Sequence, residues 1–371
     1  MRPLRHGRGQ SLSTVMHSSS SDSKTLLHLC ARSWPRPRAL KLTVHSWSWI
    51  VAGWFFAFPP PLLAEWSATA EQRTSFTTDA FQFSTARRLR FNEDPSQPTV
   101  VPIEKPEDVI WEPSLKVQRL SINGWGKNEL IVKAHGYLFT NNPAFNHGEY
   151  RLQDRQWLSD KTAVLLRYRY VPNLFLGPNF ERRTGTRSIQ EERITSHTWR
   201  VEFERRLTNT TAMALVSRYG LRRFNDTFAE RDTHFYAVGS HIRQEVGSWL
   251  AVILSYLYER GLADGRSEIQ FMDDVSYYLH VVSLETECQV TEHLTVDLAY
   301  TYMRKTFTSN LVGDTHLGRM DHTHQGHAEL RYWFTSSLMG TLSFQRTQRT
   351  STNTLRDFND SIMSVGVSYR F

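Results

Sequence analysis

The sequence has few cysteines and, beyond its N-terminal region, no long apolar run. The only two cysteines are Cys30 and Cys288. A helical membrane protein needs about 20 consecutive apolar residues for each span, so the absence of such runs and a mean hydropathy of -0.47 exclude a helical bundle. They do not exclude a membrane β-barrel, because only every second residue of its strands faces lipid.

The chain also lacks a basic recognition element outside its N-terminus. The formal net charge is +7, but much of the excess lies before residue 45. These basic residues are Arg2, Arg5, Arg8, Lys24, Arg32, Arg36, Arg38 and Lys41. We therefore predict no nucleic-acid partner. Glycine-rich phosphate loops and cysteine–histidine zinc spacings are absent as well, so we predict no cofactor.

Residues 49–58 (WIVAGWFFAF) form an apolar segment of signal-peptide length, preceded by Lys41. An Ala-x-Ala cleavage site follows at 68–70, and Ala64 offers a second site. A single membrane anchor is the alternative, but the run is short and three prolines end it. We predict a leader and cleaved signal peptide over residues 1–70 and one domain over residues 71–371.

The predicted signal peptide has two consequences. Cys30 precedes the cleavage site, so the mature chain keeps Cys288 alone and has no internal disulfide. The first 40 residues form an unusually long leader, which suggests that translation begins near residues 40–44.

The chain after residue 195 alternates apolar and polar residues with a period of two. In the segment 198–205 (TWRVEFER), Trp199, Val201 and Phe203 share one face, and charged residues share the other. Residues 250–258 and 294–302 follow the same rule. This alternation predicts strands with two chemically different sides.

Short turns and longer polar segments alternate strictly along the chain, which is typical of outer-membrane barrels. We predict an all-β fold, a transmembrane antiparallel up-and-down barrel of about fourteen strands. The predicted strands are 75–91, 108–121, 128–140, 148–158, 162–173, 195–207, 210–221, 234–246, 249–260, 275–290, 293–307, 322–334, 337–349 and 361–371. Pro113 weakens the second of them, because proline marks an edge or bulge. Twelve strands remain if the first two lie outside the wall.

The chain ends on an amphipathic strand with an aromatic last residue. Met363, Val365, Val367, Tyr369 and Phe371 share one face of this strand. The pattern resembles the C-terminal assembly signal of Gram-negative outer-membrane β-barrels of the porin-like type. The resemblance covers residues 71–371 and implies integral placement in the bacterial outer membrane. It implies as partners the barrel-assembly machinery, outer-membrane lipid and lipopolysaccharide, and it leaves the oligomeric state undefined.

If the apolar face meets lipid, the charged face lines the lumen. The predicted pore-lining residues are Arg151, Arg155, Arg167, Arg169, Arg200, Glu202, Glu204, Arg218, Arg243, Glu245, Glu329 and Arg331. Side chains alone would not readily fill a barrel of about fourteen strands, which favours a water-filled pore over a lumen plugged by ion pairs. Arginines outnumber acids in this set. We therefore predict a porin-like channel for passive diffusion of small polar or anionic solutes.

Two alternatives belong to other classes. An outer-membrane barrel hydrolase would use residues such as His241, near Arg243, or Ser255, but no Gly-x-Ser-x-Gly elbow is present. Long, ordered and aromatic loops would favour a structural or adhesive surface barrel, and the loops here are mostly 7 to 20 residues long and polar. We predict that the chain is not an enzyme.

A group of histidines and one aspartate raises the possibility of a surface metal site. The group consists of Asp314, His316, His322, His324 and His327. A polar loop rich in histidine explains it as well, and we predict no metal.

Overall fold

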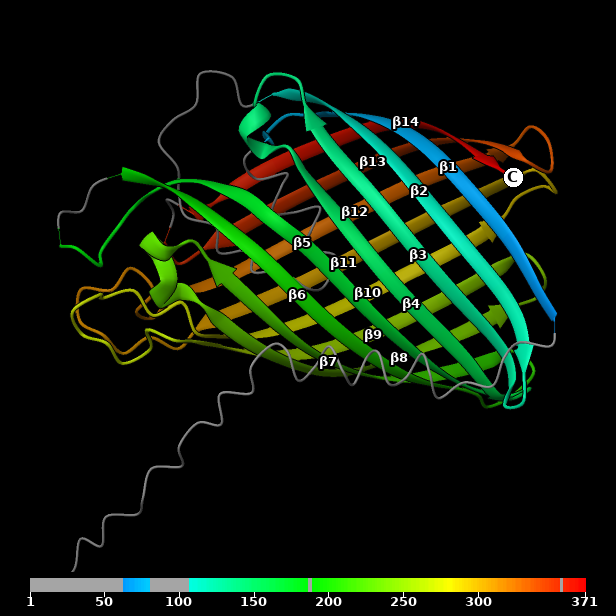
Figure 1. Cartoon of the computed structure of the whole chain (residues 1–371), viewed down its shortest axis with the longest axis horizontal. Coiled ribbons are helices and arrows are strands. Elements are labelled where there is room, and N and C mark those ends of the chain that lie inside the picture. The colour runs from blue at the N-terminus through cyan, green and yellow to red at the C-terminus, as the bar shows by residue number, and fades with distance from the viewer. Residues whose placement is uncertain (1–62, 81–106, 186–188, 354–355) are drawn as a thin grey trace, which may run out of the picture. The chain divides into compact units, whose positions relative to one another are not determined.

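The chain folds into a closed barrel of antiparallel strands, each paired with its neighbours in sequence, with the first paired to the last. The computed structural model describes residues 63–80, 107–185, 189–353 and 356–371. The strands are β1 (Leu63–Thr77), β2 (Asp108–Asn123), β3 (Gly126–Phe139), β4 (His147–Ser159), β5 (Thr162–Phe180), β6 (Ile189–Arg206), β7 (Thr211–Phe224), β8 (Thr233–Val246), β9 (Leu250–Ala263), β10 (Tyr277–Gln289), β11 (Leu294–Phe307), β12 (Met320–Trp333), β13 (Leu338–Ser351) and β14 (Phe358–Arg370). The fourteen-strand barrel is confirmed, and twelve strands are excluded (Figure 1).

The wall has its apolar side chains outside and its polar side chains inside. In β14, Met363 and Val365 are 55% and 56% exposed, whereas Ser364 between them is 3% exposed. A water-soluble protein would bury the apolar set. Because alternate residues of a strand point to opposite faces, the apolar side chains here lie on the outer surface. In a membrane barrel this surface contacts the lipid hydrocarbon rather than water.

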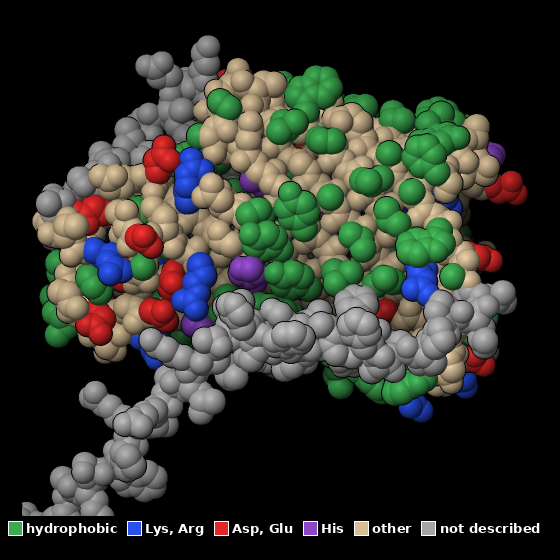
Figure 2. Space-filling view, in the orientation of Figure 1, with side chains coloured by type: hydrophobic (Ala, Val, Ile, Leu, Met, Phe, Trp, Pro, Cys, Tyr) green, Lys and Arg blue, Asp and Glu red, His purple; other side chains and the backbone are tan. Residues whose placement is uncertain are grey.

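The facing side of the molecule shows the same division. Figure 2 shows hydrophobic side chains spread over the strand wall, with charged side chains gathered toward its two ends. An apolar band flanked by polar ends is the surface expected for a barrel that crosses a membrane.

The two ends of the barrel differ in their connections. Turns such as Asn123–Gly126 and Ser159–Thr162 close one end, called here the short-turn end. The other, long-loop end carries the longer connections and the 3-10 helices η1 (Pro143–Phe145) and η2 (Asp226–Arg231) (Figure 1). In the described part of the chain, none of the helices has the length or apolar character needed to cross a membrane.

The hairpin of β5 and β6 extends further than the sequence predicts. The strands were expected to end at residue 173 and begin at 195, but they run to Phe180 and from Ile189. Register shifts between Val171 and Leu174 and between Phe175 and Gly177 let the paired chains bend as they leave the wall.

Pro113 lies within β2, in the wall, and its effect is local. Trp111 pairs with Leu138 and Ser114 with His135, so the register with β3 is the same on both sides of the proline. Because proline lacks an N–H, the ladder is interrupted there without a shift.

The first strand lies elsewhere than predicted. The prediction of residues 75–91 is wrong, because β1 is Leu63–Thr77. This strand pairs with β2 along its whole length and with β14 from Thr69 to Thr77. Residues 81–91 of the predicted strand lie outside the described residues, as do the apolar segment 49–58 and its prolines.

The position of β1 bears on the predicted cleavage site, because Ala70 lies in the middle of the strand, between Tyr369 and Leu115 on its two neighbours. Cleavage there would leave only residues 71–77 in β1. A membrane strand needs about 9–11 residues, so the seam with β14 would no longer cross the membrane.

We therefore expect the mature protein to begin at Glu65, after the alternative site at Ala64, rather than at Glu71. Edman sequencing or intact mass of the protein purified from outer membranes measures this directly. A mature chain beginning at Glu71 would show that closure does not require the first half of β1.

Candidate functional site: the charged lumen

The predicted pore-lining residues all lie on the inward face of the wall. On β6, for example, Arg200 and Glu202 alternate with the outward-facing Val201 and Phe203, which are 46% and 42% exposed. Alternate positions of each strand point to opposite faces of the wall, and the positions that carry the predicted charged residues point into the lumen. Their role in conduction stays a prediction.

Ion pairs join several of these arginines to acids on the same strand or on another of the strands β4, β5 and β6. Arg155 donates to Glu204 at 2.8 Å, and Arg200 pairs with Glu202 at 2.5 Å. Two further arginines share one carboxylate, that of Glu149. The distances to it are 3.3 Å from Arg151 and 2.9 Å from Arg169.

A second set of ion pairs involves arginines of the strands β1, β7, β8 and β12. It comprises Arg218 with Glu259 (3.5 Å), Arg243 with Glu245 (3.7 Å) and Glu287 (3.4 Å), Arg331 with Asp297 (2.6 Å) and Glu287 (3.6 Å), and Arg73 with Glu329 (3.1 Å). Buried charges are costly unless paired, and these pairs meet that requirement.

The sequence analysis missed several acids that face the lumen. Glu149, Glu259, Glu287 and Asp297 stand at inward positions of β4, β9, β10 and β11 and neutralise arginines of the predicted set. The period of two in the sequence could have identified these acids, because each stands at the same alternate positions as the other inward polar residues of its strand. The apparent arginine excess is therefore largely compensated.

Arg167 is the exception in the predicted set. Its Nε donates to the Gln153 side chain at 2.9 Å, and it forms no ion pair among the described residues. It lies directly opposite Arg200 on β6, and Arg200 in turn lies opposite Arg218 on β7. The three arginines form a row across neighbouring strands, which are about 4.8 Å apart.

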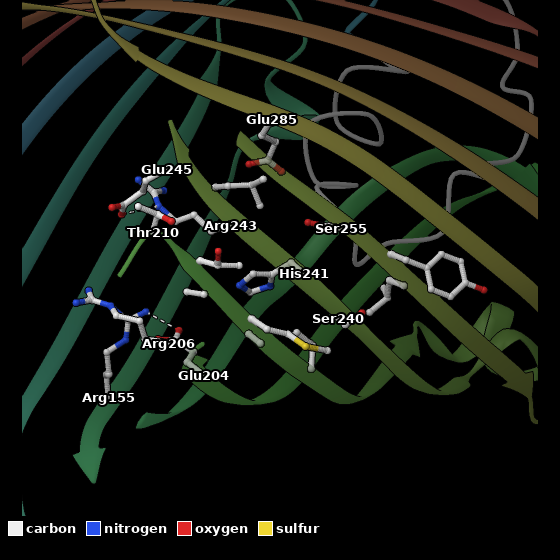
Figure 3. Close-up of a pocket in the computed structure, with 18 of the residues that line it drawn as sticks. Arg155, Glu204, Arg206, Thr210, Ser240, His241, Arg243, Glu245, Ser255 and Glu285 are labelled. Atoms are coloured by element: carbon white, nitrogen blue, oxygen red, sulfur yellow. Dashed lines mark hydrogen bonds and ion pairs between the residues drawn. The ribbon is translucent and has the colours of Figure 1, made fainter. Parts of the chain in front are cut away.

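A cavity of about 660 Å³ opens inside the barrel at the short-turn end. Arg155, Glu204, Arg206, Arg243 and Glu285 line it, together with small residues such as Ala212 and Ala214 (Figure 3). Its size and mixed charges suit a hydrated polar solute better than an apolar ligand.

The two residues considered for a hydrolase meet in this cavity. His241 lies directly opposite Ser255 in the pairing of β8 with β9, and both line the cavity (Figure 3). No hydrogen bond joins them within the described part of the chain. A nucleophile and its base are expected within about 2.6–3.2 Å of each other, so the juxtaposition by itself does not make a catalytic pair.

The residues considered for a metal site do not come together as one group. His322 and His324 face outward from β12, where they bond Tyr302 and Tyr300, both at 2.7 Å. His327 faces the lumen from the same strand. The proposed group therefore divides between the two faces of the wall and the loop that precedes β12.

Asp314 and His316 instead join Asp273 at the long-loop end, with ligand atoms within 4.8 Å of one another. Asp314 accepts hydrogen bonds from the backbone N–H groups of Asp274 and His316, from Ser309 Oγ and from the His316 ring. These bonds occupy both of its oxygens and fasten loop 308–319 to loop 264–276, so we assign the cluster to loop packing.

Arg231 of η2 connects loop 264–276 to the start of β6. It pairs with Glu192 and with Asp273, both at 2.6 Å, and all three side chains are buried. Burial by itself would lower the pKa of Arg231, but the two carboxylates raise the pKa above its ordinary value. This buried ion triad holds three segments of the long-loop end together, namely the start of β6, η2 and loop 264–276.

Glu230, next to Arg231 in η2, is 3% exposed, and no other described residue hydrogen-bonds its carboxylate. Burial and the neighbouring charge of Asp273 raise the pKa of Glu230 to about 7, against the opposing effect of Arg231 and Arg183. The long-loop end thus contains an acid that titrates near neutral pH.

The predicted assembly residues lie on the outer surface of the last strand. Val365, Val367 and Tyr369 are 56%, 51% and 47% exposed, and Phe371 after the strand is 71% exposed. The Phe371 N–H donates to the Ala68 carbonyl on β1. Recognition by an assembly machinery stays a prediction.

The closed wall, its apolar outer face and its charged interior define a porin-like transmembrane β-barrel. Residues 267–371, which contain β10–β14, match the family described as "Putative beta-barrel porin 2". This match confirms the resemblance to porin-like barrels drawn from the sequence. No curated protein matches the chain.

Several solved outer-membrane barrels are similar to this chain at very low sequence identity and with TM-scores below 0.5. The outer membrane channel DcaP of Acinetobacter baumannii has 8% identity and a TM-score of 0.49, covering 83% of this chain and 97% of its own. The trimer form of OmpT from Vibrio cholerae has 8% identity and a TM-score of 0.47, with 83% and 99% covered. An anion-selective porin from Comamonas acidovorans has 6% identity and a TM-score of 0.43, with 83% and 99% covered.

Proposed function

We propose that this chain is an integral outer-membrane channel for the passive diffusion of small solutes, with a preference for anionic ones. The observation that carries the preference is Arg167, a lumen cation with no ion-pair partner in the described residues. The other arginines of the predicted set are neutralised by nearby carboxylates.

The surroundings of Arg167 strengthen this argument. Arg200 stands opposite it, and Arg151 and Arg155 lie on the neighbouring strand β4. A solute anion near Arg167 would relieve the repulsion among these guanidinium groups. A guanidinium binds carboxylates and phosphates through paired hydrogen bonds, so carboxylated or phosphorylated solutes fit this position.

Conductance in a planar bilayer under a salt gradient tests the proposal. The wild-type protein is expected to give steady ohmic steps and a reversal potential that indicates anion preference. A unit charge at about 4 Å in water contributes about 1 kcal/mol, so Arg167→Glu is expected to reduce the anion-to-cation permeability ratio by about fivefold or more.

Arg205→Glu is the matched control, because Arg205 is an exposed arginine on the outward face of β6. It makes the same charge change outside the lumen and is expected to leave the permeability ratio unchanged. Equal effects of the two substitutions would refute the anion site. Electrical silence of a demonstrably folded protein would refute the channel itself.

A further inference from the structure

Hydrogen-bonded tyrosine–histidine pairs recur on the outward face of the barrel. In each pair the tyrosine hydroxyl meets histidine Nδ1 on the next strand, and the strands are joined at the long-loop end. The pairs are Tyr168–His197 (2.8 Å), Tyr219–His234 (3.0 Å), Tyr256–His280 (2.9 Å), Tyr300–His324 (2.7 Å) and Tyr302–His322 (2.7 Å). The same hydrogen bond therefore recurs on four of the strand pairs that are joined at the long-loop end.

Three nitrogen-bearing side chains of this region stand side by side. His280 on β10 lies directly opposite Arg304 on β11, and Arg304 lies directly opposite His322 on β12. Neighbouring strands are about 4.8 Å apart, so the row His280–Arg304–His322 spans the width of a single lipid headgroup. Arg304 is exposed and forms no ion pair among the described residues.

The hydrogen bonds to tyrosine also orient the two rings. When the hydroxyls of Tyr256 and Tyr302 donate to Nδ1 of His280 and His322, the ring proton of each neutral imidazole lies on Nε2. Each ring then offers an N–H donor on its other side. The row supplies two imidazole donors around one guanidinium.

The row belongs to a sector of the outer face that lacks acids. Arg260 and Arg346 also face outward, from β9 and β13, and no Asp or Glu occupies an outward position on the described strands β9–β14. Arg260 lies over the Tyr278 ring at 4.0 Å, and Arg346 donates to Ser361. Among the described residues, no acid on the outward face of these strands therefore compensates the positive charge of this sector.

Two outward arginines of β6 and β7, unlike those of β9, β11 and β13, form ion pairs with acids. Arg193 pairs with Glu191 at 3.0 Å, and Arg223 pairs with Asp232 at 2.8 Å. Arg193 and Arg223 are thus neutralised by acids, whereas the outward arginines of β9, β11 and β13 form no ion pair among the described residues. This contrast argues for a ligand on the face of β9–β13.

The sector lies where the apolar wall meets the long-loop end. On β10 the outward residues toward the short-turn end are Val282 and Leu284, which are 40% and 47% exposed, and the loop 264–276 begins just beyond Tyr278. A membrane that covers the apolar residues would place its headgroups at the row His280–Arg304–His322.

We propose that the outward face of β9–β13 binds the phosphate group of an anionic lipid in the outer leaflet, centred on the row His280–Arg304–His322. This proposal rests on the proposed outer-membrane location. Phosphate offers acceptor oxygens to the guanidinium and the imidazoles in charge-assisted bonds, and the acyl chains of the same lipid cover the apolar wall below. Lipopolysaccharide, with phosphates on a glycolipid, has this chemistry.

Lipid retention by the full barrel tests the proposal. The protein is reconstituted in nanodiscs of phosphatidylcholine containing diphosphorylated lipid A, extracted with detergent, and analysed by native mass spectrometry. The wild-type protein is expected to retain lipid A. Arg304→Gln combined with His280→Gln and His322→Gln is expected to lower its apparent affinity about tenfold or more, through loss of three charge-assisted bonds.

The matched control combines Arg223→Gln with His234→Gln on the side where the arginine is already paired, and it is expected to retain lipid A as the wild type does. Circular dichroism and unchanged single-channel conductance verify folding independently of lipid binding, and they separate failure of this proposal from failure of the channel. Equal retention by both variants would overturn it. Release of lipid A by millimolar inorganic phosphate would overturn the commitment to a lipid.

Discussion

Replacing Arg231 with methionine is expected to open the long-loop end of the barrel while leaving the wall intact. The substitution leaves Glu192 and Asp273, which are 1% and 0% exposed, as buried carboxylates without their cation. Removing one partner of a buried pair costs about 3–5 kcal/mol. Hydrogen exchange followed by mass spectrometry should show protection lost from η2 and from loops 264–276 and 308–319.

Arg223→Met provides a matched control for this experiment. Arg223 lies near the same loops and also pairs with an aspartate, Asp232 at 2.8 Å, but its side chain is 45% exposed. Exposed pairs contribute about 0–1 kcal/mol, so exchange in the loops should change little. Similar exchange in the two variants would show that the buried triad does not hold the loops.

Glu230→Gln is expected to remove a pH dependence of the same loops. In the folded protein Glu230 keeps its proton up to a pKa of about 7, above its ordinary value of 4.5. The folded state therefore binds more protons between these values, and the loops lose stability as pH rises through this window. The pKa difference corresponds to on the order of 3 kcal/mol.

Loop protection, corrected for intrinsic exchange rates, should fall between pH 5 and pH 8 in the wild type and stay level in Glu230→Gln. The neutral amide mimics the protonated acid, so the variant should resemble the wild type at pH 5. Asp226→Asn, an exposed acid of the same helix, should keep the wild-type slope. A slope that persists in Glu230→Gln would assign the pH dependence to another group.

The sequence predicts the strands correctly where the residues of a strand themselves show a hydrophobic period of two. Strands such as β9 and β11 have an apolar or aromatic residue at five successive alternate positions, from Leu250 to Tyr258 and from Leu294 to Tyr302, which mark the face that meets lipid. Their predicted limits agree with the structure to within a few residues. The period of two is a local property, and it needs no knowledge of the partner strand.

The first strand could not be placed in this way. Its segment from Ala64 to Ala70 is rich in small residues, which also suit a signal cleavage site. What makes it a strand is its ladder with β2 and β14, and the partners of Ala70 in that ladder are distant in sequence. Local patterns carry no information on such partners.

In the lumen, the sequence predicts which residues point inward but not which of them lie opposite each other. Strand parity places Arg167 and Arg200 inside, but only the register between β5 and β6 sets them opposite each other. Register likewise decides which arginines find a carboxylate. The triad of Glu192, Arg231 and Asp273 depends on contacts among loops, for which the sequence offers no periodic pattern.

The pairing of β1 with β14 has a consequence for how the barrel folds. All other strand pairs join neighbours in the chain, whereas this seam joins Thr69 to Arg370 and Thr77 to Ile362. Closing a longer loop costs more chain entropy, and contacts distant in sequence slow folding. We expect the hairpins to form first and the seam last, so that an open, curved sheet with two unpaired edges is the final intermediate before closure.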